Sequence, residues 1–427
     1  MVRKFQFPVL LAESSLMHVH GFIGIIFLMC IGLVFSTDRK QISLRIIGAC
    51  LLLQAGIGVL VLRLPAGQAV LRAISDIVTQ ILSYGGEGAR FLFGALVGPK
   101  MHEIFPDGSY IFAFQVLPSL VYVSALIAIL YHFGIMQGVA RLLGRGLQWL
   151  AGTSPVESFG AIITIFVGQS ELPVALGPYL TSMSESELAS TMCSGTASIS
   201  GATLIGYFGL GIPASYLVAA SFMAIPGGLM FAKILEPRAS GAPVSSINAG
   251  QAAYHRAFFE ALMEGAQKGA QTAVAVAAML VACIGLIALV NGVLQGIGGH
   301  IGLSMLSLEY LMGLIFAPIA WMLGVPASEC DAVGSVLGLK VVLNEFVAYF
   351  HLGPDIQAGR LSKRAAAIAS FALCGFANLS SLGLLVAAFG SQCSDRREEI
   401  ARKSARAVLG GLLSNLMSAA IAGIIMP

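Results

Sequence analysis

The sequence has very little charge for its length. Of its 427 residues, 11% are Asp, Glu, Lys or Arg, whereas soluble domains carry about 25%. Hydrophobic residues make up 57%, and the 50 glycines suit helices that pack closely in lipid better than they suit a soluble core. The scarcity of charge excludes a soluble domain and indicates a polytopic membrane protein.

Residues that bind metals or perform catalysis are also scarce. The seven cysteines are scattered without a CxxC pair, and His18 with His20 is too isolated a pair to indicate a metal. No constellation of His or Asp accompanies the intramembrane acids, so a membrane enzyme is disfavoured, and neither catalytic residues nor a cofactor is expected. The net charge of +3 gives no reason to expect a nucleic acid partner.

The chain instead contains many long apolar segments. Segments of about 20 residues predict eight transmembrane helices, near residues 18–36, 43–63, 110–134, 188–210, 213–235, 270–293, 364–389 and 406–426. Three stretches that mix charges with apolar residues at helical spacing predict helices in the membrane interface, at residues 66–84, 136–150 and 254–269. The predicted fold is an all-α membrane protein with one clear linker, residues 236–251.

Clusters of Lys and Arg predict the orientation of these helices. The clusters follow the first, third, fifth and seventh predicted helices, at residues 39–45, 141–145, 233–256 and 396–406. With eight crossings all four clusters lie on one side of the bilayer, and the positive-inside rule makes that side cytoplasmic. Both termini are then expected outside.

The two halves of the chain repeat one pattern. Trp149 precedes an apolar run that reaches GQSELP (168–173), and Trp321 precedes one that reaches LNEFVAYF (343–350). These are the only two tryptophans in the sequence. Each run is long enough to enter the membrane, but the predicted orientation requires it to return to the side it left.

We therefore expect two re-entrant hairpins, at residues 155–180 and 326–350. The first enters from the cytoplasm and the second from outside, so the halves form an inverted repeat whose tips meet at a midplane cavity. Ser154 and Glu157 predict a capping box at the start of the first hairpin.

The repeat divides the chain into four predicted regions. Residues 1–150 and 236–325 hold the scaffold helices, the interfacial helices and the linker. Residues 151–235 form the first repeat, and residues 326–427 form the second together with the C-terminal helix.

Each hairpin tip carries an acid, Glu171 in the first and Glu345 in the second. A carboxylate inside a bilayer costs at least about 2.5 kcal/mol on insertion scales, so two at equivalent positions indicate a binding site shared between the halves. Gln169 and Ser170 add an amide and a hydroxyl at the first tip, and Asn344 adds an amide at the second. Together these groups suit a ligand rich in hydrogen-bond donors and acceptors.

Other polar residues near the tips have two open interpretations. Lys340, shortly before Glu345, either contributes to the site or simply neutralises that acid. The hydroxyl residues of CSGTASISG (193–201) are more often helix packing than ligands. In CGFANLSS (374–381), Gly375 and the polar residues after it predict that the helix unwinds, which would expose backbone to a substrate.

GQSELP, the G-x-K-x-x-x-NEFVAY pattern of residues 338–349 and CGFANLSS together resemble the concentrative nucleoside transporter family, in its bacterial nucleoside permease branch. The resemblance spans nearly the whole chain. It implies a homotrimer in the bacterial inner membrane, with one nucleoside site per protomer built from two hairpins and two unwound helices, and an elevator-like movement of the transport domain.

The resemblance also implies roles for individual residues. Gln169, Ser170 and Glu171 resemble the residues that contact the nucleobase, and Phe376 resembles the aromatic residue beside the base. The residues that resemble the ribose-binding set are Glu345, Asn378 and Ser381. The chemistry agrees, because ribose hydroxyls suit a carboxylate and an amide.

The chain departs from the family's pattern where the coupling ion binds. Sodium-coupled members have an asparagine where this chain has Thr164 and a serine where it has Ala202, which removes two ligands from a hard-cation site. Proton coupling is therefore preferred over sodium coupling, without a bound metal. The candidate ion-coupling residues are Thr164, Val167, Glu171 and Glu345.

These features predict a proton-coupled nucleoside importer. A sodium-coupled symporter for nucleosides or nucleobases is the alternative, and a channel fits two asymmetric clusters of acid and amide less well than it fits a ring of charge.

Overall fold

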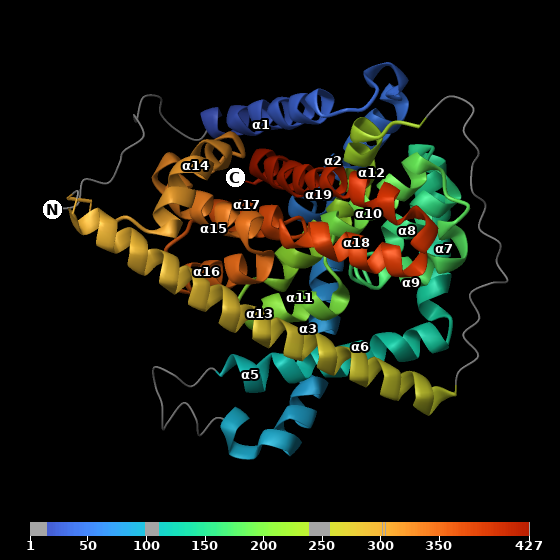
Figure 1. Ribbon diagram of the computed structural model, residues 1–427, viewed down its shortest axis with the longest axis horizontal. Helices are drawn as coiled ribbons and strands as arrows, with labels where there is room; N and C mark the ends of the chain where they lie inside the picture. The colour runs from blue at the N-terminus through green and yellow to red at the C-terminus, as the bar shows by residue number, and fades with distance from the viewer. Residues whose placement is uncertain (1–14, 99–110, 239–256, 301, 304, 427) are drawn as a thin grey trace.

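The computed structural model describes residues 15–98, 111–238, 257–300, 302–303 and 305–426, and every regular element within them is a helix. Five of these helices are long and apolar enough to cross a membrane. The prediction of an all-α membrane protein is confirmed. Figure 1 shows the two hairpins, α8 with α9 and α15 with α16, at opposite ends of the molecule.

The described part begins with helices that precede the first repeat. They are α1 (Ser15–Val34), α2 (Leu44–Leu62), α3 (Pro65–Phe93), α5 (Phe112–Gln115) and α6 (Leu117–His132), with short 3-10 turns at Arg39–Gln41 and Gly94–Val97. Proline at the first position of α3 suits a helix start, because its missing N–H would have no partner there. Helix α3 covers the predicted interfacial stretch 66–84 but extends nine residues further.

The first repeat follows in six helices. They are α7 (Ile135–Ala151), α8 (Pro155–Ile163), α9 (Leu172–Leu180), α10 (Glu185–Ala197), α11 (Gly201–Gly209) and α12 (Ala214–Leu235). Gly152 takes φ +72° after α7, a left-handed conformation that ends helices without strain in glycine. Ser154 and Glu157 then form the predicted capping box of α8, with the Ser154 N–H 2.9 Å from Glu157 Oε2.

The second repeat has the same order of elements. It comprises α14 (Leu308–Met322), a 3-10 turn (Ala327–Glu329), α15 (Cys330–Val342), α16 (Glu345–Gln357), α17 (Lys363–Leu373), α18 (Ser380–Gln392), a 3-10 turn (Ser394–Arg396) and α19 (Arg397–Ile425). Each repeat is thus a helix, a hairpin of two short helices, a broken helix and a long helix. The order of elements therefore repeats, and it includes one helix before each predicted repeat, α7 before residues 151–235 and α14 before residues 326–427.

Two parts of the second repeat differ from the sequence prediction. Helix α14 was not predicted, because its 15 apolar residues fall short of a full membrane span. The second hairpin was predicted to end at residue 350, and that boundary is wrong because α16 continues to Gln357. Helix α16 ends just before Gly359, whose φ of +64° is a left-handed conformation that suits a glycine after a helix.

The stretch 254–269 was predicted to be a separate interfacial helix, and this is wrong for the residues that are described. Residues 254–256 lie outside the described part, and the rest belongs to α13 (Phe258–His300), one continuous helix of 43 residues. No proline interrupts it, and Lys268 pairs with Glu264 one turn away at 3.1 Å. At 1.5 Å per residue α13 is about 65 Å long, roughly twice a hydrocarbon core. Figure 1 shows it crossing the molecule diagonally.

The predicted transmembrane helices at 188–210 and 364–389 are both broken in the middle. The first divides into α10 and α11 around Ser198, which is extended, and Ser200 caps α11 by accepting a bond from the Thr203 N–H at 3.2 Å. The second divides into α17 and α18 across residues 374–379, where unwinding was predicted. The count of eight crossings remains a prediction.

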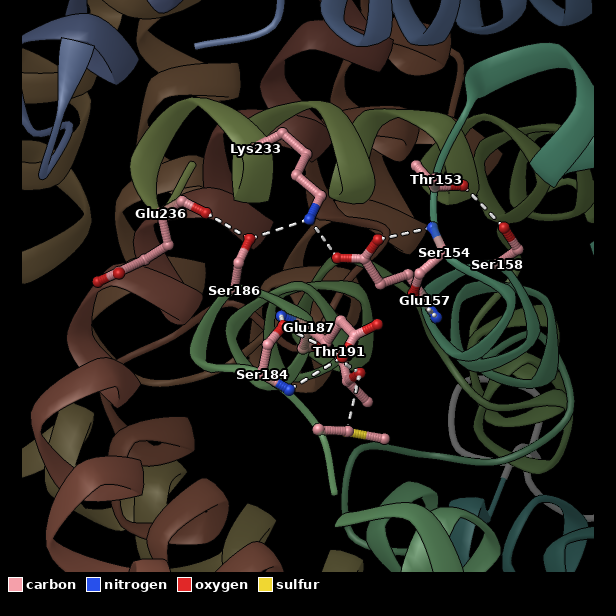
Figure 2. Close-up of polar contacts among 11 residues, drawn as sticks. Thr153, Ser154, Glu157, Ser158, Ser184, Ser186, Glu187, Thr191, Lys233 and Glu236 are labelled. Carbon is pink, nitrogen blue, oxygen red and sulfur yellow. Dashed lines mark hydrogen bonds and ion pairs between the residues drawn. The ribbon is translucent and has the colours of Figure 1, made fainter. Parts of the chain in front are cut away.

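A buried ionic cluster fastens one end of the first repeat, as Figure 2 shows. Lys233 of α12 donates to Glu157 of α8 and, at 2.9 Å, to Ser186 of α10, whose hydroxyl donates to the Glu236 carbonyl at 2.8 Å. Lys233 and Glu157 are only 3% and 2% exposed, so each charge depends on the other. The start of the hairpin is thereby tied to two longer helices.

Candidate functional site

The first hairpin tip lies between α8 and α9 and places one side chain inward. Gln169 is buried, and its Nε2 donates to the Ser381 hydroxyl in the second repeat at 3.0 Å. Its Oε1 is buried without a hydrogen-bond partner among the described residues. A buried acceptor without a partner is costly, so Gln169 presents an acceptor that a ligand would satisfy.

The break before α18 is organised by Asn378. Its Oδ1 accepts bonds from the Ser381 N–H at 3.0 Å and from the Ser380 hydroxyl at 2.6 Å, which caps the first turn of α18. Its Nδ2 donates to Glu345 Oε2 at 2.8 Å. The Ser381 hydroxyl donates to the Phe376 carbonyl, so the start of α18 is also bonded to the unwound segment before it.

Glu345 begins the second arm of the second hairpin. It stands at the N-terminus of α16, where the helix dipole favours negative charge, and only 4% of it is exposed. Besides Asn378, its carboxylate accepts a bond from the Tyr207 hydroxyl of α11 at 2.9 Å. The acid is therefore held by donors from both repeats.

These contacts make one continuous chain of hydrogen bonds. It runs from Tyr207 through Glu345, Asn378 and Ser381 to Gln169. Both hairpins and both broken helices contribute to it. The structure thus brings together four of the residues predicted to bind substrate, although they are spread over more than 200 positions.

Phe376 lies beside the first tip. A Cβ built on Gly168 would stand 3.7 Å from Phe376 Cε2 and 3.6 Å from Ser200 Cβ, so the ring, the tip and the first break are neighbours. The ring is partly exposed. An aromatic face beside polar groups can stack on a flat heterocycle.

Ser170 and Glu171 lie outside the hydrogen-bond chain. Both are exposed, and among the described residues the Glu171 carboxylate accepts a single long bond, 3.4 Å, from the Gly168 N–H within its own tip. Lys268 of α13 and Tyr131 of α6 interact electrostatically with Glu171. This acid therefore faces the helices outside the repeats, with oxygen atoms free to meet a ligand.

The two other candidate ion-coupling residues lie just before the first tip. Thr164 is buried, and its hydroxyl donates to the Ala161 carbonyl of its own helix at 2.7 Å, while Val167 is buried and apolar. Ser198 donates to the Thr164 carbonyl at 3.4 Å, a long bond. The side chain of Ala202 lies outside the described part.

Lys340 does not form a salt bridge with Glu345 among the described residues. Its ammonium donates instead to the Ala372 carbonyl at 2.7 Å and to Asn415 Oδ1 at 2.8 Å. The geometry therefore does not support the interpretation that Lys340 neutralises Glu345 through a direct ion pair.

Tyr207 and Asn415 were not predicted from the sequence. A tyrosine in an apolar helix gives no signal of its own, and Tyr207 is 138 positions from the acid that it contacts. Asn415 did give a signal, because a lone amide in the apolar stretch 406–426 needs buried partners.

Known proteins resemble the chain along nearly its whole length. Models described as the Na+ dependent nucleoside transporter N-terminus and C-terminus match residues 23–96 and 216–423, and one described as nucleoside recognition matches residues 113–214. "Nucleoside permease NupC" of Helicobacter pylori is 42% identical over 414 residues, which cover 96% of this chain and 98% of the relative.

Solved structures agree with the sequence comparison. CNTnw in an inward-facing substrate-bound state superposes with a TM-score of 0.91 at 43% identity, covering 96% of this chain and 98% of that one. A variant of CNTnw in an outward-facing state also gives 0.91 at 43% identity, covering 96% and 97%. Both the sequence and the fold therefore place this chain, a multi-pass membrane protein, in the concentrative nucleoside transporter family, a family of transporters and not of enzymes.

Proposed function

We propose that the protein is a secondary active nucleoside importer of the bacterial inner membrane that works by ion-coupled symport. The observation that carries the proposal is the hydrogen-bond chain from Tyr207 to Gln169, which joins both hairpins and both broken helices. A solute bound there contacts both hairpins and both broken helices. The inward-facing and outward-facing structures of CNTnw support alternating access.

The ribose is assigned to Glu345, Asn378 and Ser381. A carboxylate accepts from two hydroxyls at once, and the amide beside it both donates and accepts, which suits the neighbouring hydroxyls of a ribose. Their burial supports this assignment, because hydrogen bonds to a charged group are strongest away from water.

The base is assigned to Gln169, Ser170 and Glu171, with Phe376 stacking beside it. The buried Gln169 Oε1, which has no partner within the described part of the chain, supports this assignment, because the N–H edge of a base would satisfy it. An amide and an acid satisfy the edges of purines and pyrimidines alike, so these residues do not select between them.

The coupling ion is proposed to be a proton, carried by Glu171 or Glu345. The engaged Thr164 hydroxyl supports this proposal, since it replaces an amide of the sodium-coupled pattern and is bonded within its own helix. Sodium coupling, of a nucleoside or a nucleobase, is the alternative. The names of the matching family models, which say Na+ dependent, favour it.

We further propose that the protein is a homotrimer in which each protomer moves its repeats like an elevator past α6 and α13. Both features follow from the family resemblance. The close packing of α6 on α13 supports a rigid scaffold: a Cβ built on Gly265 would stand 2.8 Å from Ala125 Cα.

The proposed substrate is tested by uptake into proteoliposomes. Labelled uridine is competed with adenosine, pseudouridine and free uracil, and nucleosides are expected to compete while uracil does not, because only nucleosides engage Glu345 and Asn378. The Glu345→Gln variant, checked for insertion in the membrane, is expected to abolish uridine uptake. Competition by uracil as strong as by uridine, or wild-type uptake by this variant, would contradict the ribose assignment.

A further inference from the structure

Lys340 is a fully buried lysine in the first arm of the second hairpin. None of its surface is exposed, and its ammonium meets two neutral acceptors, the Ala372 carbonyl and Asn415 Oδ1, at 2.7 and 2.8 Å. Burying an ionisable group without a directly bonded counter-ion costs free energy of folding, so a lysine at this position calls for an explanation beyond packing.

The two bonds of Lys340 hold the ends of both broken helices. Ala372 lies in the last turn of α17, where carbonyls lack helical partners and the helix dipole favours a cation. Asn415 continues the contact, because its Nδ2 donates to the Cys374 carbonyl at 2.8 Å and to the Ala197 carbonyl, the end of α10, at 2.6 Å. We call Lys340 and Asn415 the clasp.

The clasp connects the same two segments as the proposed ribose pair. Lys340 joins the first arm of the second hairpin to the end of α17, and the Leu379 N–H donates to the Val341 carbonyl at 3.1 Å one residue further on. Glu345 and Asn378 form the third link between these segments. Three successive contacts therefore fix the hairpin against the break, and the ribose pair is the last of them.

Space around the clasp leaves no room for adjustment. A Cβ built on Gly375 would stand 2.2 Å from Asn415 Oδ1 and 2.6 Å from the Ala197 carbonyl oxygen, so the two breaks approach each other as closely as glycine allows. The Lys340 ammonium also interacts electrostatically with the Glu345 carboxylate, although the two are not directly bonded. Loss of the ammonium would therefore alter both the position and the charge balance of that acid.

We propose that Lys340 is a positioning residue for ribose recognition: through the clasp it holds Glu345 and Asn378 at the spacing that the ribose hydroxyls require. This inference rests on the proposed nucleoside transport. It predicts that the loss of Lys340 weakens the recognition of the sugar and not merely the stability of the protein.

The test compares uridine with 2′,3′-dideoxyuridine, which lacks both ribose hydroxyls of the sugar ring. KM is measured for both in proteoliposomes with wild-type protein and with Lys340→Met, which keeps the length of the side chain. We expect the KM for uridine to rise at least about tenfold and the KM for the dideoxy analogue to change little, so the variant discriminates less between them. A discrimination ratio equal to that of the wild type would overturn the inference.

Lys233→Met is the matched control. Lys233 is also buried, and its substitution also removes an ammonium that is bonded to a neighbour, here Glu157. It lies in the ionic cluster of Figure 2, however, away from the ribose pair. It is expected to lower the melting temperature in detergent while leaving the discrimination ratio at the wild-type value. If both variants lost discrimination, the removal of any buried lysine would have this effect, and the specific role of Lys340 would be overturned.

If Lys340→Met does not insert, Asn415→Ala tests the clasp from its other side. It removes the acceptor of Lys340 and the donor to both breaks, and the discrimination ratio is again expected to fall. A wild-type protein that takes up no nucleoside would instead refute the proposed function itself, and the two failures are thus distinguishable.

Discussion

At the scale of single residues, the Glu345 carboxylate depends on two neutral donors, the Tyr207 hydroxyl and the Asn378 amide, at 2.9 and 2.8 Å. A hydrogen bond to a charged group contributes about 1.5–3 kcal/mol. Tyr207→Phe removes one of the two while keeping the ring, so we expect the KM for nucleosides to rise roughly tenfold or more, since about 1.4 kcal/mol corresponds to a factor of ten. Concentration-dependent uridine uptake measures it.

Tyr349→Phe is the control for this prediction. Tyr349 stacks on Tyr207 with ring centroids 4.5 Å apart, but its hydroxyl donates to the Ser370 carbonyl at 2.8 Å and not to Glu345. Its removal is expected to reduce stability and leave KM near the wild-type value. An equal rise of KM in both variants would show that ring packing, and not the bond to the acid, determines substrate affinity.

Much of the site at this scale was predictable, because polar atoms inside apolar stretches are few and need partners. Gln169 and Glu345 stood out for that reason, Asn378 and Ser381 were assigned through the family resemblance, and the structure joins all four. The partners themselves were not predictable, since a contact such as that of Tyr207 depends on how distant helices pack and leaves no trace in local sequence.

At the scale of elements, the packing of α13 on α6 depends on the glycines that face α6. A Cβ built on Gly269 would stand 2.6 Å from Val121 Cα and 2.9 Å from the Leu120 carbonyl oxygen, both backbone atoms that cannot move aside. Gly269→Ala is therefore expected to destabilise the protein by about 1–3 kcal/mol, as overpacking does. The melting temperature in detergent measures this effect.

Gly285 of the same helix provides the comparison. No described atom lies within 4 Å of the Cβ that an alanine would add there, so Gly285→Ala is expected to melt close to the wild type. If the two alanine variants had the same melting temperature, the role of Gly269 would not be to allow the close approach of α13 to α6.

The sequence predicted these elements unevenly. Apolar length located the long helices, and Ser154 with Glu157 marked the start of the first hairpin, because caps are local features. The length of α13 was misjudged because charged residues on one face of its first turns resembled an interfacial helix. The face beside it, with Ala261 and Gly265, is buried.

At the scale of the whole molecule, the two repeats are similar in order but not in detail. The arms of the first hairpin are nine residues each and those of the second are thirteen. The first is fastened at its start by the ion pair of Lys233 with Glu157, and the second near its tip by Lys340. Topology made the repeat predictable, whereas the fastenings arise from contacts between helices far apart in the chain.

The coupling ion is a property of the whole transport cycle, and imposed gradients test it. A hard-cation site needs several oxygen ligands, and where the sodium-coupled pattern has an asparagine this chain has Thr164, whose hydroxyl is bonded within its own helix. We therefore expect an inward proton gradient alone, without sodium, to drive concentrative uridine uptake in proteoliposomes, and a sodium gradient at equal pH to drive none. Glu171→Gln and Glu345→Gln then identify the carrier, as the variant in which uridine exchanges across the membrane but no longer follows the proton gradient. Uptake that requires sodium and ignores the pH gradient would refute proton coupling, and it would leave backbone carbonyls near Thr164 as the ligands that compensate for the missing amide.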